Sequence, residues 1–313
     1  MAALMAPGQP PSASAELQAP SLRAPAIQWY PGHIAKAEKA LTAHLEKVDL
    51  VIEVRDARIP LATGHPRLRR WIGAKQHLLV LNRLDMISPA ARQAWDTWFR
   101  SQGQTPWWCD AKSGTGVKQL QQAAIRAGDA LNTRRRDRGM KPRPVRALML
   151  GFPNVGKSAL INRLVRQKVV ESARRAGVTR SLRWVRLGQD LDLLDAPGVL
   201  PPRLDDQQAA LRLALCDDIG QAAYDCEGAA LAFVELLVWL EQLPQAGVAA
   251  GLLAGRYGVA MDHQDPAASS SWLAAAAARH TSGDLQRMST KLLDDFRRSH
   301  LGAIALELPS CTT

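Results

Sequence analysis

The sequence predicts an α/β fold, with a mainly parallel sheet and helices on both of its faces, followed by a small all-α domain. Three observations carry this prediction. Apolar runs of strand length alternate with stretches of helical spacing through the first two-thirds of the 313 residues, which is the pattern of a parallel sheet. The segment GFPNVGKS, at 151–158, stands between one such run and one such helix. From Asp205 onward the strand signals stop, and stretches rich in Ala and Leu take over.

Local patterns justify the individual elements of the first half. Helical spacing begins after His33, and apolar runs rich in Val, Ile and Leu predict strands at 48–54 and 77–82. The segment SPAARQAWDTWFRSQG predicts a helix, because it has a Ser cap, an early Pro and a terminal Gly. A third strand is expected in TPWWCDA, and a helix is expected from about 117 to 136.

Composition divides the chain into three parts. We expect a disordered tail rich in Ala, Pro and Ser at 1–26, an α/β domain at 27–204 and a helical domain at 205–305. A basic connector broken by Gly and Pro, TRRRDRGMKPRPVR at 133–146, interrupts the α/β domain. It is followed by the strand VRALMLG, the helix KSALINRLV and the strands SLRWVRL and LDLLDAP. Helices of the last domain are expected at 207–219, 228–243, 246–255, 270–280 and 284–300.

The net charge of +11, with a sequence pI of about 10.0, is unevenly distributed. Residues 1–204 hold 33 Lys and Arg against 15 Asp and Glu, a net of +18. The remaining residues, 205–313, hold 7 against 14, a net of −7. A strongly basic region indicates an anionic partner, with nucleic acid as the first candidate, but says nothing about the fold.

Composition also disfavours several classes of protein. None of the four cysteines has the spacing of a CxxC pair, so a zinc site or disulfide framework is disfavoured and a reducing compartment fits better. The longest apolar run, 228–240, contains Glu235 and is too short to cross a bilayer. We therefore expect a cytoplasmic protein without a membrane partner. A transit peptide in the tail is a weaker alternative, because Arg is scarce there.

GFPNVGKS fits the phosphate-loop pattern G-x-x-x-x-G-K-[ST]. In such a loop backbone amides hold the phosphates, Lys157 reaches the β- and γ-phosphates, and Ser158 binds magnesium. A Gly-rich turn without a ligand is the alternative, but a strand before the loop and a helix after it favour phosphate binding. The expected nucleotide contacts are Pro153, Asn154, Val155, Gly156, Lys157, Ser158 and Ala159.

A second motif, DAPG at 195–198, contains an acidic residue and ends an apolar strand downstream of the phosphate loop. Asp195 can hold magnesium through water, and the amide of Gly198 can reach the γ-phosphate. Between the two motifs lies RRAGVTRS, in which Thr179 is the candidate for a switch residue that contacts magnesium. Each segment alone is also compatible with an ordinary turn or surface loop.

Guanine recognition is predicted upstream of the phosphate loop, in NRLD at 82–85. This segment ends a strand and resembles the N-K-x-D motif of GTP-binding proteins. Asp85 can accept two hydrogen bonds from the guanine edge, and Asn82 can brace the loops. Arg83 replaces the Lys of the pattern, and its planar cation on a long stem can lie over the base.

The segment CDAKSG, after the third predicted strand, resembles the fifth GTPase motif, S-A-K. Asp110 stands in place of the Ser, and Lys112 completes the motif. The amide of Ala111 is expected to touch the guanine oxygen.

The five motifs therefore occur in the order fourth, fifth, first, second, third. This order is typical of circularly permuted GTPases. Together with WYPGHIAKA near the start and DARIP after the first strand, it makes the chain resemble the YlqF/RbgA family of ribosome biogenesis GTPases from residue 27 to about residue 300.

The resemblance implies GTP hydrolysis coupled to late assembly of the large ribosomal subunit. The implied partners are the precursor of the large subunit and its rRNA, and no binding to DNA is expected. Val199 and Leu200 stand where many GTPases have the Gln that orients the attacking water. The resemblance implies His33 as the substitute, a structural His being the alternative. It also implies that Asn154 helps to hold a potassium ion.

Permutation places the helical domain directly after the DAPG switch, so a movement of the switch between GTP and GDP states could re-aim that domain. The resemblance to the family implies that the helical domain binds RNA. Its acidic charge favours the connector and the α/β domain as phosphate contacts instead. A local basic face could still carry the role, formed by Arg279, Arg287, Arg297 and Arg298. A purely stabilising appendage is the alternative.

Two functions remain open on these grounds. The first is a GTPase that acts in ribosome assembly, favoured by Lys157, Ser158 and Asp195. The second is a nucleotide-gated RNA-binding placeholder with little intrinsic hydrolysis, favoured by the missing Gln. An ATP-using enzyme is disfavoured by Asn82 and Asp85.

Overall fold

The computed structural model describes residues 24, 25, 27, 44–165, 183–196, 198 and 205–309 of the protein. Several segments for which the sequence makes predictions lie outside this part of the chain. These segments are most of the tail, most of the helix expected after His33, and the positions Thr179, Val199 and Leu200.

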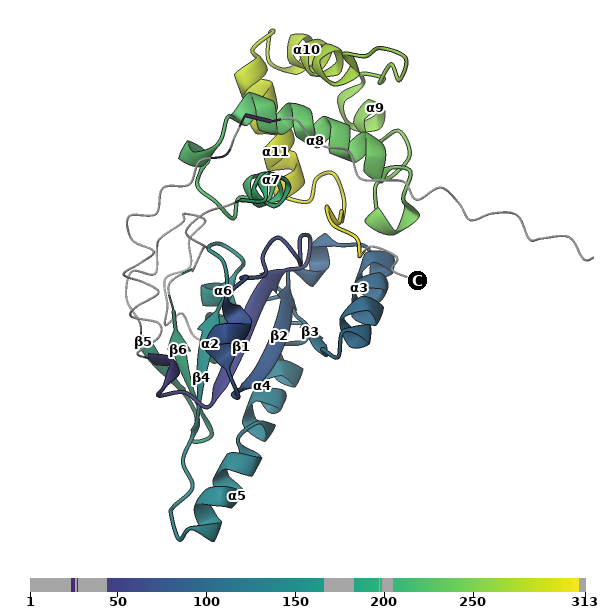
Figure 1. The fold of residues 1–313 in the computed structure, drawn as a ribbon. Coiled ribbons are helices and arrows are strands. Elements are labelled where there is room, and N and C mark those ends of the chain that lie inside the picture. The colour runs from purple at the N-terminus through teal and green to yellow at the C-terminus, as the bar shows by residue number, and fades with distance from the viewer. Residues whose placement is uncertain are drawn as a thin grey trace, which may run out of the picture.

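The described chain forms one six-stranded sheet in the order β3-β2-β1-β4-β6-β5 (Figure 1). Neighbouring strands run parallel, except that β5 is antiparallel to β6. The predicted mainly parallel sheet is therefore confirmed. The strands are β1 (Leu50–Asp56), β2 (Gln76–Asn82), β3 (Pro106–Trp108), β4 (Val145–Leu150), β5 (Arg183–Leu187) and β6 (Leu191–Asp195).

Strand β1 comes first in the chain but lies in the middle of the sheet. Its Leu50 is in register with Gln76 of β2 on one side and with Ala147 of β4 on the other. Apolar residues Leu50, Val51, Ile52 and Val54 are all buried, as expected for a strand covered on both faces. This central strand joins the strand that leads into NRLD to the strand that leads into the phosphate loop.

Helices cover both faces of the sheet, as predicted. The helices α2 (Leu68–Ile72) and α3 (Pro89–Ser101) pack on one face, and α4 (Val117–Arg126) and α6 (Lys157–Val165) pack on the other. The predicted cap of α3 is present, because Ser88 Oγ accepts a hydrogen bond from the Ala91 amide at 3.0 Å.

The helix expected from about 117 to 136 is divided in two. It ends with α4, and a second helix, α5 (Asp129–Asp137), extends away from the sheet (Figure 1). The division falls at Gly128, which lies so close to the Val145 side chain that an added Cβ would be 1.8 Å from its Cγ2. The connector is correspondingly shorter than predicted, because 133–137 belong to α5 and β4 begins at Val145.

The last third of the described chain is helical, as predicted. Asp206, Asp225 and Asp284 each cap a helix by accepting hydrogen bonds from its first amides. No helix in the described ranges combines the length and apolar character that crossing a membrane requires. The helices are α7 (Gln207–Leu215), α8 (Cys226–Leu240), α9 (Leu252–Tyr257), α10 (Ala268–His280) and α11 (Leu285–Arg297), with short 3-10 turns at Gln221–Ala223 and Pro244–Ala246.

The helical domain lies over the edge of the sheet and shares a continuous buried core with the α/β domain (Figure 1). The segment 301–309, after α11, returns to the α/β domain. Glu307 accepts hydrogen bonds from the amides of Leu61 (2.7 Å) and Ala62 (3.1 Å), and its carbonyl accepts one from Trp95 Nε1 at 3.0 Å. Ile27, near the other end of the chain, donates its amide to Gln207 of α7 at 2.9 Å.

Candidate functional site

The sequence motifs meet at one edge of the sheet, although their order in the chain is permuted. NRLD follows β2, CDAKSG follows β3, the phosphate loop follows β4, and DAPG begins with the last residue of β6. These four strands are parallel, so all four motifs lie at their carboxyl ends. This is the edge where open α/β sheets bind their ligands.

Asn82 braces two of the motifs, as predicted from the sequence. Its Nδ2 donates to the Val155 carbonyl at 2.9 Å, and its Oδ1 accepts from the Ala111 amide at 3.1 Å. Gly156 makes room for it: a Cβ at Gly156 would lie 2.2 Å from Asn82 Nδ2, and its φ of +94° also requires glycine. The phosphate loop and the segments NRLD and CDAKSG are therefore connected through one buried side-chain amide.

The Ala111 amide, which is expected to touch the guanine oxygen, donates to Asn82 in this structure. Asp110, in the place of the usual Ser, accepts from the amides of Lys112 (2.7 Å) and Ser113 (3.0 Å), and so shapes the turn. Although burial opposes ionisation, these bonds hold the pKa of Asp110 below its ordinary value. A contact from Ala111 to guanine would have to share or replace its bond to Asn82.

Asp85 is available to a ligand. It lies in the 3-10 turn Leu84–Met86, the residue as a whole is exposed, and it makes no side-chain hydrogen bond to another described residue. Its carboxyl group is nevertheless partly desolvated, and this desolvation and the charge of the neighbouring Asp110 raise the pKa of Asp85. A guanine edge that donates two hydrogen bonds would compensate this unfavourable environment for the carboxylate.

The guanidinium of Arg83, expected to lie over the base, contacts protein groups in this structure. It adopts a left-handed backbone conformation with φ of 65°. Its Nη2 donates to the Asn154 carbonyl, and its Nη1 lies 3.4 Å from Asp56 Oδ2. Asp218 Oδ1 lies 3.9 Å from Nη2. In this arrangement the stem of Arg83 is the part without these polar contacts.

Lys157 is a buried cation inside the phosphate loop, with 6% of its surface exposed. Its Nζ donates to the carbonyls of Gly151 (3.1 Å) and Phe152 (2.6 Å). Burial lowers the pKa of Lys157 to about 8, and the charges of Asp195 and Asp218 oppose this shift. Phosphate oxygens at this position would supply the anionic partner that Lys157 lacks.

Asp195 is the carboxylate best suited to a magnesium ion. It is completely buried, and neither of its oxygens has a hydrogen-bond partner in the described structure. Burial raises the pKa of Asp195 to about 6, against the influence of Lys157. A buried carboxylate without donors fits a hydrated divalent cation, and the half-buried Ser158 at the start of α6 supplies a hydroxyl of the type magnesium accepts.

Gly198 brings the third motif against the first. A Cβ at Gly198 would lie 2.7 Å from both Cα and N of Pro153, so this close approach requires glycine. The end of DAPG therefore packs directly on the phosphate loop. The expected magnesium ligand Thr179 and the expected water-orienting His33 lie outside the described residues.

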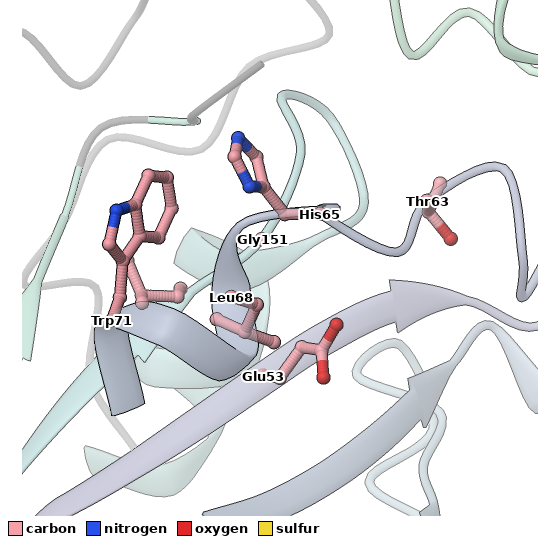
Figure 2. Close-up of a pocket in the computed structure, with 7 residues that line it drawn as sticks. Glu53, Thr63, His65, Leu68, Trp71 and Gly151 are labelled. Atoms are coloured by element: carbon pink, nitrogen blue, oxygen red, sulfur yellow. The ribbon is translucent and has the colours of Figure 1, made fainter. Parts of the chain in front are cut away.

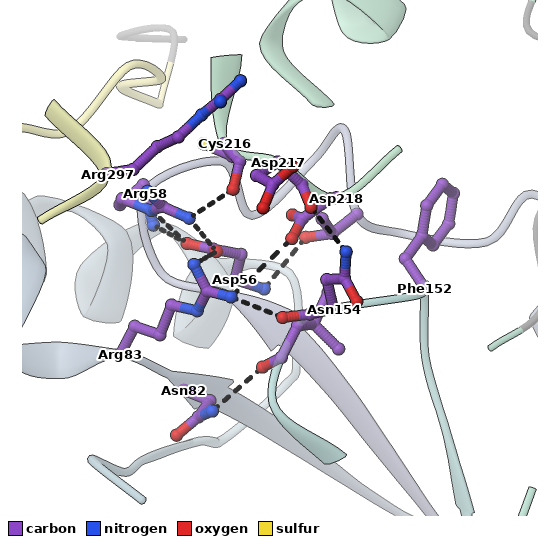
Figure 3. A network of polar contacts seen from close by, with 12 residues as sticks. Asp56, Arg58, Asn82, Arg83, Phe152, Asn154, Cys216, Asp217, Asp218 and Arg297 are labelled. Carbon is purple, nitrogen blue, oxygen red and sulfur yellow. Dashed lines mark hydrogen bonds and ion pairs between the residues drawn. The ribbon is translucent and has the colours of Figure 1, made fainter. Parts of the chain in front are cut away.

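A buried network of charges joins the helical domain to the nucleotide motifs (Figure 3). Asp56 and Arg58 of DARIP are both completely buried, and Arg58 donates to the two oxygens of Asp56 at 3.0 and 2.7 Å. Arg58 also donates to the Cys216 carbonyl at 3.1 Å. From the same turn of the helical domain, the Asp217 carbonyl accepts from Asn154 Nδ2 at 2.7 Å.

The two buried aspartates of this network have opposite charge preferences. Although burial opposes ionisation, the charges of Arg58 and Arg83 keep the pKa of Asp56 below its ordinary value. Burial and the charge of Asp56 raise the pKa of Asp218, whose oxygens have no hydrogen-bond partner in the described structure. Sequence reasoning assigned no individual role to Asp56, Arg58, Asp217 and Asp218. Charged residues directly after a buried strand, and the pair of aspartates after Cys216, were the available signals.

Comparison with known proteins agrees with this geometry. A family model described as 50S ribosome-binding GTPase matches residues 146–227. Ribosome biogenesis GTPase A of Bacillus pumilus is 36% identical over 205 residues, which cover 66% of this chain and 73% of the relative. The protein of the same name from Priestia megaterium is 36% identical over 222 residues, covering 70% and 77%. Mouse mitochondrial ribosome-associated GTPase 1 is 33% identical over 201 residues, covering 61% of each chain.

A solved structure has the same fold. The crystal structure of GNP-bound YlqF from T. maritima aligns with a TM-score of 0.58 and 21% sequence identity, covering 88% of this chain and 99% of that one. Fold and motif order together define a circularly permuted GTPase. The chain belongs to the ribosome biogenesis GTPase A family.

Proposed function

We propose that this GTPase acts in late maturation of the large ribosomal subunit and binds precursor particles and their rRNA according to its nucleotide state. The names of its relatives support an action on ribosomes: ribosome biogenesis GTPase A in bacteria and mitochondrial ribosome-associated GTPase in the mouse. The description of the matching family model, a 50S ribosome-binding GTPase, supports the large subunit. The basic α/β domain supports contact with phosphates.

The observation that carries the nucleotide dependence is the contact between the turn at 216–218 and the nucleotide motifs. Asn154 of the phosphate loop binds the Asp217 carbonyl, and Arg83 of NRLD lies beside Asp218. The helical domain thus has two connections to the nucleotide site: the chain that follows DAPG, and this turn. A rearrangement of the phosphate loop on GTP binding would change both connections and so change how the helical domain is held.

For the chemical step, we assign magnesium to Ser158, Thr179 and Asp195, and a potassium ion to Asn154. The orphaned oxygens of Asp195 support the first assignment. Magnesium, when bound, would neutralise the phosphate charge that develops during transfer. Lys157 would hold the β- and γ-phosphates, and His33 would orient the attacking water in place of a Gln.

Guanine would be held by Asp85, with the stem of Arg83 against the base and with Asn82 keeping the loops in register. The remaining contacts to the nucleotide would come from the backbone of Asp110, Ala111, Lys112, Gly198 and the loop from Pro153 to Ala159.

The second candidate function, a placeholder on rRNA with little intrinsic hydrolysis, is supported only by the apolar pair Val199 and Leu200 after DAPG. We place either activity in the cytoplasm, where the free thiols of the described cysteines stay reduced.

Co-sedimentation with purified ribosomal particles tests the proposal. The full chain is centrifuged with large-subunit precursors, mature large subunits and small subunits, in GDP and in a non-hydrolysable GTP analogue. The expected result is retention on precursor particles that is stronger with the analogue. Lys157→Ala serves as a control that should lose the nucleotide dependence. Equal retention on all three particles, or none, would contradict the proposal.

A further inference from the structure

A groove of about 550 Å³ lies on the face of the sheet that carries α2 and α3, away from the nucleotide motifs. Its walls come from β1 and β2, from α2 with the loop before it and the turn after it, and from the loop between α3 and β3. The turn at Gly73–Lys75 and the loop at 102–104 precede β2 and β3, whereas the nucleotide motifs follow these strands. The groove is therefore a separate site.

A small cavity, whose lining residues are shown in Figure 2, shares three of these residues with the groove. Glu53 from β1, His65 from the loop before α2, and Leu68 from α2 line both. The cavity ends at Leu150 and Gly151, where β4 enters the phosphate loop. The small cavity thus lies between the lining shared with the groove and the start of the phosphate loop.

The charged side chains that line the groove have a net positive charge, because Arg55, Arg69 and Lys75 outnumber one carboxylate. Glu53 is the single carboxylate among them, with 2% of its surface exposed. Arg55 forms an ion pair with it at 2.6 Å, and His77 Nε2 lies within hydrogen-bond distance of it at 3.0 Å. Although burial opposes ionisation, these neighbours hold the pKa of Glu53 below its ordinary value. Arg55 is itself committed, because it also donates to the Pro60 carbonyl at 3.1 Å.

Two further cations line the groove and remain available. Arg69 on α2 is exposed, Lys75 in the following turn is half-buried, and neither forms an ion pair with a described carboxylate. Gln102 and Gln104, on the opposite wall, add amide groups that can donate hydrogen bonds. The available groups of the groove are therefore donors and cations, which match an anion rich in oxygen acceptors.

We propose that this groove binds the phosphodiester backbone of RNA. Pockets for small molecules are mostly apolar with a few polar groups, whereas polar and charged side chains dominate this lining. Phosphate contacts by Arg, Lys and side-chain amides are the usual way in which proteins hold a nucleic-acid backbone. The inference deepens the proposed function, on which it rests, by naming the surface through which the GTPase touches rRNA.

The test is RNA binding by the full chain, measured by fluorescence anisotropy with a fluorescein-labelled single-stranded RNA of mixed sequence. The double variant Arg69→Gln/Lys75→Gln removes the two available cations. The matched control, Lys118→Gln/Arg126→Gln, removes two exposed cations from α4 on the opposite face of the sheet. GDP affinity and thermal unfolding of both variants should match wild type, which verifies that each is folded.

The groove variant should bind the RNA at least about tenfold more weakly at about 0.1 M salt, and the control should bind like wild type. The slope of log affinity against log salt should become shallower by about 1.4 in the groove variant, because each lost phosphate contact on single-stranded RNA removes about 0.7. Wild-type affinity and slope in the groove variant would overturn the inference.

The same proteins are then sedimented with large-subunit precursors. Retention of the wild type and loss of the groove variant support the inference. If both are retained equally, the groove inference fails while the proposed function stands. If the wild type is not retained in any nucleotide state, the proposed function fails. A variant that loses the particle but binds free RNA like wild type would mean that the groove takes an acidic protein surface, which also overturns the inference.

Discussion

The side-chain amide of Asn154 donates a hydrogen bond to the main-chain carbonyl of Asp217 at 2.7 Å. Both residues have left-handed backbones, with φ of 57° and 63°, a conformation that Asn and Asp tolerate better than most residues. The phosphate loop is thereby bonded directly to the first turn after α7. Because Nδ2 faces Asp217, Oδ1 is the side-chain atom of Asn154 that remains for a cation.

Replacing potassium by sodium should slow GTP hydrolysis, because sodium is smaller and would fit Oδ1 of Asn154 and the phosphates less well. Turnover is measured in the two chloride salts at equal ionic strength. Asn154→Ala should be slow in both salts, since it removes the proposed ligand. Equal rates in potassium and sodium for the wild type would remove potassium from the mechanism.

Asp85→Asn should weaken GTP binding and favour xanthine nucleotides, because an amide cannot accept both hydrogen bonds from a guanine edge. The exposed position of Asp85 means that the fold should be unaffected. Affinities for GDP and for xanthosine diphosphate, compared by calorimetry, measure the change. A variant that binds GDP as tightly as wild type would show that Asp85 is not the guanine reader.

GTP binding should take up protons around pH 8. The pKa of Lys157 is about 8 without nucleotide, so the amine is partly neutral there, and phosphates that favour the charged form raise this pKa on binding. Affinity should accordingly fall as pH rises above 8. Calorimetry in two buffers of different ionisation enthalpy detects the uptake.

Lys157→Arg is the control for this proton uptake, because a guanidinium stays charged over the whole range. It should bind GTP without uptake near pH 8, whatever its affinity. Identical binding heats for the wild type in both buffers would contradict the assignment of a partly neutral Lys157.

Arg58→Ala should lower the free energy of unfolding by about 3–5 kcal/mol, because it leaves the buried Asp56 without its main partner. Arg143→Ala breaks the partly exposed pair with Asp49 and should cost about 1 kcal/mol or less. Urea unfolding measures both. An effect of Arg58→Ala no larger than that of Arg143→Ala would mean that the buried network contributes little.

The features that could be predicted from sequence depend on near neighbours. Ser88 and its following Pro define the start of α3, and the structure shows the predicted cap. The phosphate loop and NRLD lie at strand ends because apolar runs precede them, so their meeting at one edge followed from a parallel sheet alone. The hydrogen bonding of Asn82 between the loops could also be predicted, because the NRLD motif implies it.

The features that could not be predicted depend on residues far apart in the chain. The guanidinium of Arg83 contacts Asp56 and Asn154, and no local sequence pattern indicates these contacts. The predicted helix at 117–136 divides because Gly128 meets Val145 of a later strand. Likewise, nothing near Asp217 in the sequence indicates its contact with the phosphate loop.

The most direct test of the account is GTP turnover by the full chain with and without purified large-subunit precursors, in potassium and saturating GTP. The account predicts slow turnover by the protein alone and a rise of at least about tenfold with precursor particles, because the particle completes the positioning of the water that Val199 and Leu200 cannot orient. His33→Ala should lose this stimulation while keeping its affinity for GTP. Turnover that is the same with and without particles, in protein that binds them, would contradict the account and favour the placeholder.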